Sequence, residues 1–174
     1  VSWTPTATGR QAIMLRAENS AGSDEQRVGV WVAEAERQTL AIMSGRVALS
    51  AFNDGFVGAS YDGRGGFGFD GASALFSGTL LVGASPNQVS GSLYASEFSP
   101  LAPIASGGDA ALDGFEVVTD TRFSDARAPT PAGVDVSHRI YARDAISNAV
   151  VAEYIVINRS GAALAGLHVG LAMD

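Results

Sequence analysis

Cysteine and lysine are both absent from this chain of 174 residues. Without cysteine, the chain has no disulfide, no thiolate metal ligand and no cysteine nucleophile. Without lysine, it has no Schiff-base chemistry and no phosphate-binding lysine of the P-loop kind. The two absences exclude whole classes of covalent and nucleotide chemistry.

Positive charge is also scarce. All 11 basic residues are arginines, scattered along the chain, and the formal net charge is −7. Nucleic-acid binding is disfavoured because phosphate contacts need a basic surface. No apolar run approaches the ~20 residues of a membrane helix, so we expect no membrane insertion. No signal peptide begins the chain, and a secreted parent protein would carry its signal upstream of Val1.

Catalytic signatures are few. The segment Gly71–Leu75 lacks the final glycine of a Gly-x-Ser-x-Gly nucleophile elbow. The two histidines, His138 and His168, lie 30 residues apart on different expected strands and provide too few ligands for zinc. Three glutamates could supply paired carboxylates for glycosidic chemistry, but nothing in the sequence brings two together: Glu97, Glu116 and Glu153. We predict that the chain is not an enzyme.

Short alternating apolar segments, separated by turn signals, fill residues 39–174. They predict about ten strands and an all-β domain, a β-sandwich. The clearest expected strands are 46–52, 74–83 (with a break at Ser77-Gly78), 89–94, 114–123, 138–143, 150–158 and 167–173. The run Asn53-Asp54-Gly55 after the first of them predicts a hairpin turn. No segment carries a convincing helical stripe, although 33–43 could form a short helix on propensity alone.

Residues 1–36 form a separate group of three short expected strands, too few to close a sandwich. They are expected at Val1–Trp3, 12–17 and 28–32, with a turn at 19–22 between the last two. The runs Trp3-Thr4-Pro5, Ala17-Glu18-Asn19 with Gly22, and Val28-Gly29-Val30 follow one another in order. This pattern resembles the last three strands of bacterial Ig-like, cadherin-like repeats, and the resemblance implies a spacer or adhesive module. The polar run 34–38 is the expected boundary. The alternative is that these strands are extra edges of the main domain.

A second resemblance covers most of residues 45–174. It rests on Asn53–Gly58, Phe76–Gly83, Glu97-Phe98, Ile155–Gly161 and Gly166–Asp174. In this order they resemble a non-catalytic β-rich region of large secreted bacterial proteins, often beside subtilisin-like peptidase domains. The resemblance implies an extracellular accessory role without catalytic residues. The family's closing motif continues into a Trp-Asp pair beyond the position of Asp174, so we expect the domain to be truncated there.

The glycine-rich segment 61–73 holds the candidate binding residues. Residues 65–73 fit most of a calcium nonapeptide, but that site requires stacked repeats and the chain has one copy. Asp62 and Asp70 are candidate Ca²⁺ ligands, because hard cations bind flexible carboxylate loops. Tyr61, Phe67 and Phe69 could form an aromatic platform for a glycan. The alternatives are a glycine-rich hairpin, solvated turn aspartates and aromatic side chains packed in the core.

These observations predict an all-β chain, a β-sandwich (39–174) preceded by a partial Ig-like module (1–36). We expect a non-catalytic accessory, spacer or adhesion module of a larger bacterial protein that is secreted or on the cell surface. Its partners would be other domains of the same polypeptide and possible glycan or cell-surface ligands. The alternatives are a carbohydrate- or calcium-binding module and a non-catalytic part of a secreted subtilisin-like peptidase.

Overall fold

A computed structural model describes residues 9–20, 22–32, 35–58, 67–93, 97–106, 115–143 and 148–174. Its described secondary structure is entirely β, with every strand pair antiparallel and no helix among these residues. The all-β prediction is therefore confirmed. The strands are β1 (Gly9–Asn19), β2 (Gly22–Val32), β3 (Thr39–Ser44), β4 (Val47–Phe52), β5 (Phe56–Gly58), β6 (Phe67–Phe69), β7 (Ala72–Leu75), β8 (Ser77–Ser85), β9 (Gln88–Ser90), β10 (Ser99–Pro100), β11 (Glu116–Ser124), β12 (Val134–Ala142), β13 (Val150–Asn158) and β14 (His168–Met173).

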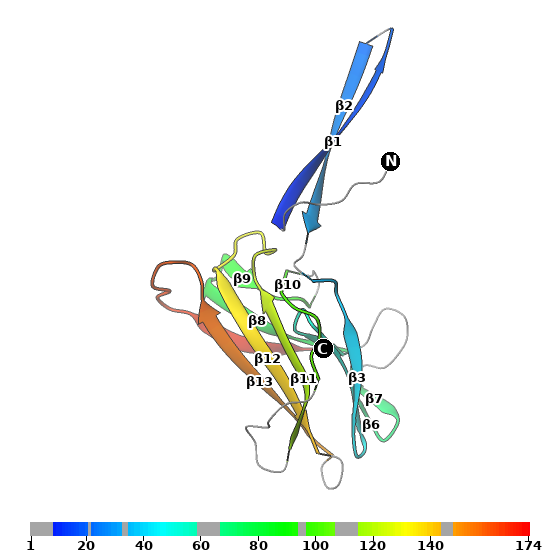
Figure 1. The fold of residues 1–174 in the computed structure, drawn as a ribbon. Helices are drawn as coiled ribbons and strands as arrows, with labels where there is room; N and C mark the ends of the chain where they lie inside the picture. Colours follow the sequence, from blue (N-terminus) through cyan, green and yellow to red (C-terminus); the bar gives the residue numbers. More distant parts are fainter. Residues whose placement is uncertain are drawn as a thin grey trace.

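Strands β1 and β2 form a two-stranded sheet of their own, a long hairpin that Figure 1 draws apart from the other sheets. The expected strands at 12–17 and 28–32 lie within it, and the expected turn joins them. The strand expected at Val1–Trp3 lies outside the described residues.

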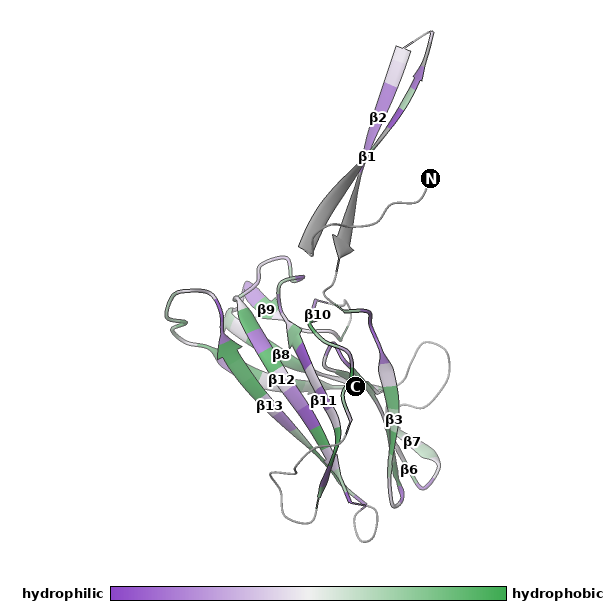
Figure 2. Ribbon diagram, in the orientation of Figure 1, coloured by the Kyte–Doolittle hydropathy of each residue, from purple (hydrophilic) through white to green (hydrophobic). Residues whose placement is uncertain are grey.

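Two larger sheets make up the rest of the described chain. The four-stranded sheet has the order β10-β11-β12-β13. The eight-stranded sheet has the order β14-β8-β5-β4-β6-β7, with β3 beside β4 and β9 beside β8. Alternation along β12, visible in Figure 2, directs Val134, Val136 and Ile140 inward. Apolar residues on one face of a strand are what a core on that side requires. Asp135 and Tyr141, on the other face of β12, are buried as well.

The buried core lies between these two sheets and consists of two clusters. The first joins β8 to β11 and β12 through Leu80, Val82, Phe98, Phe123, Ala132, Val134 and Val136. The second joins β3, β4 and β5 to β12 through Ile42, Leu49, Ala51, Val57, Ile140 and Ala142. Strand β12 contributes to both clusters, so it links the two halves of the core.

Several boundaries differ from the sequence expectations. The possible helix over 33–43 is wrong: β3 occupies Thr39–Ser44, where Ile42 and Ser44 are buried and Ala41 and Met43 are exposed. Pairing with β4 and this alternating burial outweigh helix propensity, which is a weak local preference. The break expected at Ser77-Gly78 falls instead at Phe76, between β7 and β8.

Other strands changed in length. Strand β9 covers Gln88–Ser90, where a strand over 89–94 was expected, and β12 begins at Val134, ahead of the expected 138–143. None of the described residues lies in a helix long and apolar enough to cross a bilayer.

Candidate functional site

The tight turn between β4 and β5 has the sequence Asn53-Asp54-Gly55 and is almost completely buried. Gly55 has φ of 76°, a conformation that glycine adopts without strain. A Cβ atom at this position would lie 2.3 Å from the Phe123 ring, so the turn packs directly on the opposite sheet. The backbone of this turn is therefore fixed by the core beneath it.

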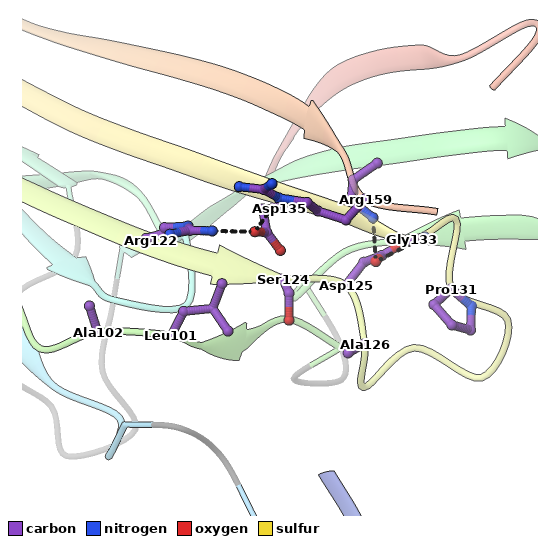
Figure 3. Close-up of a pocket in the computed structure, with 11 residues that line it drawn as sticks. Leu101, Ala102, Arg122, Ser124, Asp125, Ala126, Pro131, Gly133, Asp135 and Arg159 are labelled. Carbon is purple, nitrogen blue, oxygen red and sulfur yellow. Dashed lines mark hydrogen bonds and ion pairs between the residues drawn. The ribbon is translucent and has the colours of Figure 1, made fainter. Parts of the chain in front are cut away.

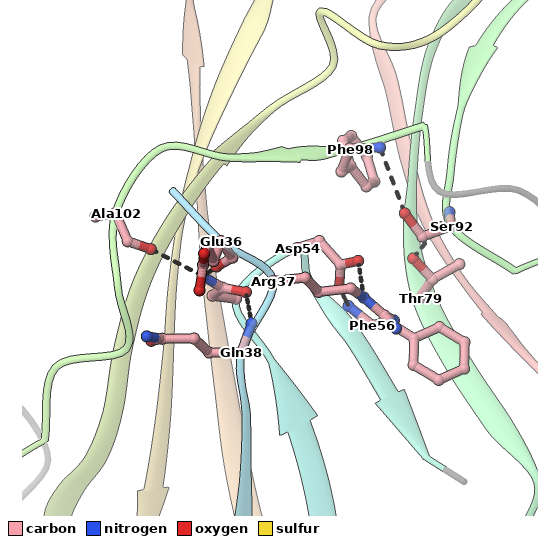
Figure 4. Close-up of polar contacts among 10 residues, drawn as sticks. Glu36, Arg37, Gln38, Asp54, Phe56, Thr79, Ser92, Phe98 and Ala102 are labelled. Atoms are coloured by element: carbon pink, nitrogen blue, oxygen red, sulfur yellow. Dashed lines mark hydrogen bonds and ion pairs between the residues drawn. The ribbon is translucent and has the colours of Figure 1, made fainter. Parts of the chain in front are cut away.

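Asn53 holds the segment 35–38, called here the joint, which leads from the β1–β2 hairpin into β3. Its Nδ2 donates to the carbonyl oxygens of Glu36 and Ala102, at 2.8 and 3.0 Å, and its Oδ1 accepts from the Gln38 N–H at 2.7 Å. Figure 4 shows Glu36 and Gln38 of the joint beside Ala102, with dashed lines for these hydrogen bonds. The Asn53 backbone N–H also donates to the Gln38 carbonyl at 3.2 Å. One buried amide thus ties together three segments that are distant in sequence.

Asp54 holds the joint through charge. Its carboxylate accepts from Arg37 Nε at 2.6 Å and from the Phe56 N–H at 3.3 Å. The Asp54 side chain is buried, whereas Arg37 is half exposed and its guanidinium lies 4.1 Å from the centre of the Phe52 ring. A buried carboxylate needs such a partner, and the stacking on Phe52 keeps the arginine in place.

A hollow of about 450 Å³ lies where β11 ends and β12 begins (Figure 3). The buried Asp125 lies in the wall of this hollow and closes the loop 125–134. Its carboxylate accepts from the backbone N–H groups of Ala132, Gly133 and Val134 at 2.6, 3.1 and 2.9 Å. Its charge is therefore balanced by backbone dipoles, and its oxygens are occupied within the protein.

Asp135 lies in the same hollow between two arginines. Arg122 donates to its Oδ2 at 2.5 Å and Arg159 at 3.0 Å. The formal charges of the two arginines and of Asp125 and Asp135 cancel, so the hollow has no net charge to attract an ion. Its polar groups are arranged to join β11, β12 and the end of β13.

The structure describes only some of the site residues that were predicted in segment 61–73. Tyr61 and Asp62 lie outside the described residues. Asp70, with φ of 57°, and Gly71, with φ of 79°, form the two-residue turn of the β6–β7 hairpin. Type I′ hairpin turns need positive φ at both positions, and Asp-Gly meets that need. The hairpin alternative for this segment is thus confirmed for residues 67–75.

Asp70 and Phe69 both contact Arg46. The guanidinium forms an ion pair with Asp70, its Nε lying 2.7 Å from Oδ1, and this hydrogen bond lowers the pKa of the Asp70 carboxyl. The same guanidinium lies 4.6 Å from the centre of the Phe69 ring. Phe67 instead packs against the second core cluster. Among the described residues, no group of three or more acidic, histidine or cysteine side chains is placed to hold a metal.

The two histidines lie in different environments. His168 is exposed on β14, whereas His138 is fully buried on β12 and stacks on Tyr154 with ring centres 4.4 Å apart. Neither ring nitrogen of His138 has a hydrogen-bond partner in the described part of the chain. Burial lowers the pKa of His138 to about 4, so the imidazole is neutral at pH 7.

The residues that make these contacts, Asn53, Asp54, Asp125 and Asp135, were not singled out by the sequence as site residues. The Asn-Asp-Gly run signalled a turn, but its partners in the joint and at Ala102 lie 15 or more residues away and carry no local signal. Comparison with known proteins adds no assignment: no family model, no curated protein and no solved structure matches this chain.

Proposed function

We propose that the chain is a non-catalytic accessory module that spaces or presents other domains of a larger bacterial protein, secreted or on the cell surface. In this proposal residues 39–174 form a β-sandwich and residues 1–36 are the C-terminal part of an Ig-like module. The two facing sheets and their shared core support the sandwich, and the separate β1–β2 hairpin supports the second module.

The observation that carries the proposal is the anchoring of the joint. A flexible linker between modules is typically exposed and makes few contacts with the domains beside it. Here Asn53 binds the backbone of Glu36 and Gln38, Arg37 pairs with Asp54, and the Ala35 N–H donates to the Pro100 carbonyl at 3.3 Å. These contacts fix the direction in which the chain enters the main domain. A spacer that presents a neighbouring domain needs such a fixed direction.

A binding module built on segment 61–73 is the second candidate. Its described half offers one charged and two aromatic side chains, but Arg46 covers Phe69 and neutralises Asp70, while Phe67 contributes to the core. Calorimetry with Ca²⁺ and a glycan array test this candidate directly. A hit in either would favour binding over spacing.

Distance measurements between two spin labels test the spacer proposal, and the lack of native cysteine makes specific labelling simple. Ser20→Cys places one label beside the β1–β2 turn, and Asn87→Cys places the other in the exposed β8–β9 turn. We expect a narrow distance distribution that broadens when Asn53→Ala is added. A distribution that is equally broad with and without Asn53 would refute a fixed joint.

A screen of the chain against peptide and glycoside substrates tests the non-catalytic part separately. We expect no turnover above a heat-inactivated control. Reproducible turnover by the chain alone would show that it is an enzyme, whatever the state of the joint.

A further inference from the structure

Strand β14 is a free and unusually apolar edge of the eight-stranded sheet. It pairs with β8 on one side, and no described strand pairs with it on the other. Val169, Leu171 and Met173 are exposed by 52, 56 and 61%. Natural sheet edges are normally protected from further pairing by charges, proline or bulges. Between His168 and Asp174 this strand has none of these.

The outward-facing backbone groups of β14 can be assigned from the ladder. Asp174 exchanges both backbone hydrogen bonds with Ser77, at 2.9 and 3.3 Å. In an antiparallel pair such residues alternate along the strand with residues whose N–H and C=O groups face the other way. The backbone groups of Val169, Leu171 and Met173 therefore face the open edge.

The side chains of the same three residues lie on the inner face of the sheet. Val169 is the cross-strand partner of Val82, and Leu171 is that of Leu80. Cross-strand partners share a face, and both Val82 and Leu80 are buried in the first core cluster. An added strand would therefore extend the hydrogen-bond ladder and cover apolar side chains beside the core at the same time.

We propose that β14 pairs antiparallel with β14 of a second copy of this chain, about a two-fold axis at Leu171. In this register Leu171 faces itself and Val169 faces Met173, which uses all three outward-facing residues. Each hydrogen-bonded pair exchanges two bonds, so about six backbone hydrogen bonds form between the copies.

Charge complementarity supports a second copy as the partner. The register that pairs all three outward-facing residues also places Asp174 opposite His168 of the other copy, and the symmetry repeats this contact. An imidazole N–H donates readily to a carboxylate. On the same face Gly170 lies opposite Ala172, so small residues meet where the strands are closest. A self-complementary strand is what an isologous two-fold interface requires.

The edge strand of the other sheet lacks this complementarity. Strand β13 also exposes apolar side chains, Val151 and Ile155, but Glu153 lies between them. The Glu153 carboxylate accepts from the Tyr141 hydroxyl at 2.7 Å and lies near Arg139. Its charge opposes the approach of a further strand at that edge.

Sedimentation equilibrium of the whole chain tests the proposal. We expect a monomer–dimer equilibrium that Leu171→Lys shifts to monomer, because two lysines would meet at the axis. Ile155→Lys on β13 is the matched control and should leave the dimer unchanged. Far-UV circular dichroism verifies that both variants fold. A chain that stays monomeric up to about 1 mM, or a dimer that Ile155→Lys abolishes and Leu171→Lys does not, would overturn the proposal.

An exchange of the His168 and Asp174 side chains tests the register itself, and both positions are exposed. His168→Asp should weaken dimerisation about tenfold, because a carboxylate then faces Asp174 at two symmetric positions. Adding Asp174→His to the same chain should restore the affinity. A double variant no tighter than the single one would overturn the proposed register.

Discussion

Asp54 and Asp125 are both buried in turns of the same domain, yet different parts of the molecule balance their charges. Asp125 accepts three backbone N–H bonds from its own loop, within nine residues along the chain. Asp54 accepts one backbone bond from Phe56 and is paired with Arg37, which belongs to the joint. The Asp125 carboxylate thus binds mainly local backbone N–H groups, whereas the Asp54 carboxylate binds a side chain from a neighbouring segment.

The difference separates a structural role from a positioning role. Loss of Asp125 leaves buried N–H groups without acceptors inside the domain, and such groups are costly. Loss of Asp54 releases an arginine that is already half exposed and that water can solvate. We therefore infer that Asp125 stabilises the domain itself, whereas Asn53 and Asp54 chiefly set how the preceding segment is attached to it.

Removal of Asp125 should have the largest effect. We expect Asp125→Ala to lower the free energy of unfolding by about 4 kcal/mol, since a buried charged acceptor and its three donors are separated. The matched Asp54→Ala variant should lose about half as much. Urea denaturation of the two variants measures both values, and equal losses would contradict the distinction between the two turns.

Acid should destabilise the core through the buried His138. Its pKa is about 4 when folded and near 6.5 when unfolded, so the unfolded chain binds the proton first as the pH falls. The stability that neutral His138 provides is complete above pH 6.5 and is lost progressively down to about pH 4. The loss amounts to about 3 kcal/mol.

The control for this pH dependence is His138→Phe, which keeps an aromatic ring against Tyr154 but does not titrate. Urea denaturation of both proteins across pH 4 to 7 measures their free energies of unfolding. Towards pH 4 the native protein should lose about 3 kcal/mol more than the variant. Parallel curves would show that His138 does not govern the acid sensitivity.

Asn53→Ala should have a smaller global effect and a sharp local one. The variant loses three side-chain hydrogen bonds and leaves the buried groups of the joint without partners, at a cost of about 2 kcal/mol. Limited proteolysis should then cut within residues 35–38 before it cuts the main domain. Gln88→Ala is the control, since it removes one exposed hydrogen bond, to the Pro131 carbonyl. Uniform cleavage of the Asn53 variant would contradict a local role.

Asp70→Asn should have the smallest effect. The ion pair with Arg46 is exposed, and exposed pairs contribute little to stability. Asparagine also tolerates the positive φ of this hairpin turn. We expect an unchanged thermal midpoint, with and without added Ca²⁺. A rise in the native midpoint on adding Ca²⁺ that disappears in the variant would instead support Asp70 as a calcium ligand.

The sequence predicted the parts of the fold that follow from local patterns. Strand β13 was expected at its observed bounds because its residues alternate up to the Ser160-Gly161 turn, and Asn53-Asp54-Gly55 was expected as a hairpin turn. Strand β3 was missed because its alternation is weak, and it is defined by pairing with β4.

The polar contacts of the turns could not be predicted in the same way. The partners of Asn53 and Asp54 approach through the tertiary fold, and nothing near either residue identifies Glu36, Arg37 or Ala102. The glycine-rich segment drew attention by composition, yet its described part is a hairpin whose charged and aromatic side chains contact Arg46.

Residue-resolved hydrogen exchange at the joint tests the central claim most directly. The Gln38 N–H donates to Asn53 Oδ1 at 2.7 Å, so its exchange reports on the contact that fixes the joint. We predict that this amide exchanges as slowly as those of β4 and that Asn53→Ala raises its rate while leaving β12 protected. Exchange of the Gln38 amide at the rate of an unprotected peptide in the native protein would contradict a fixed joint.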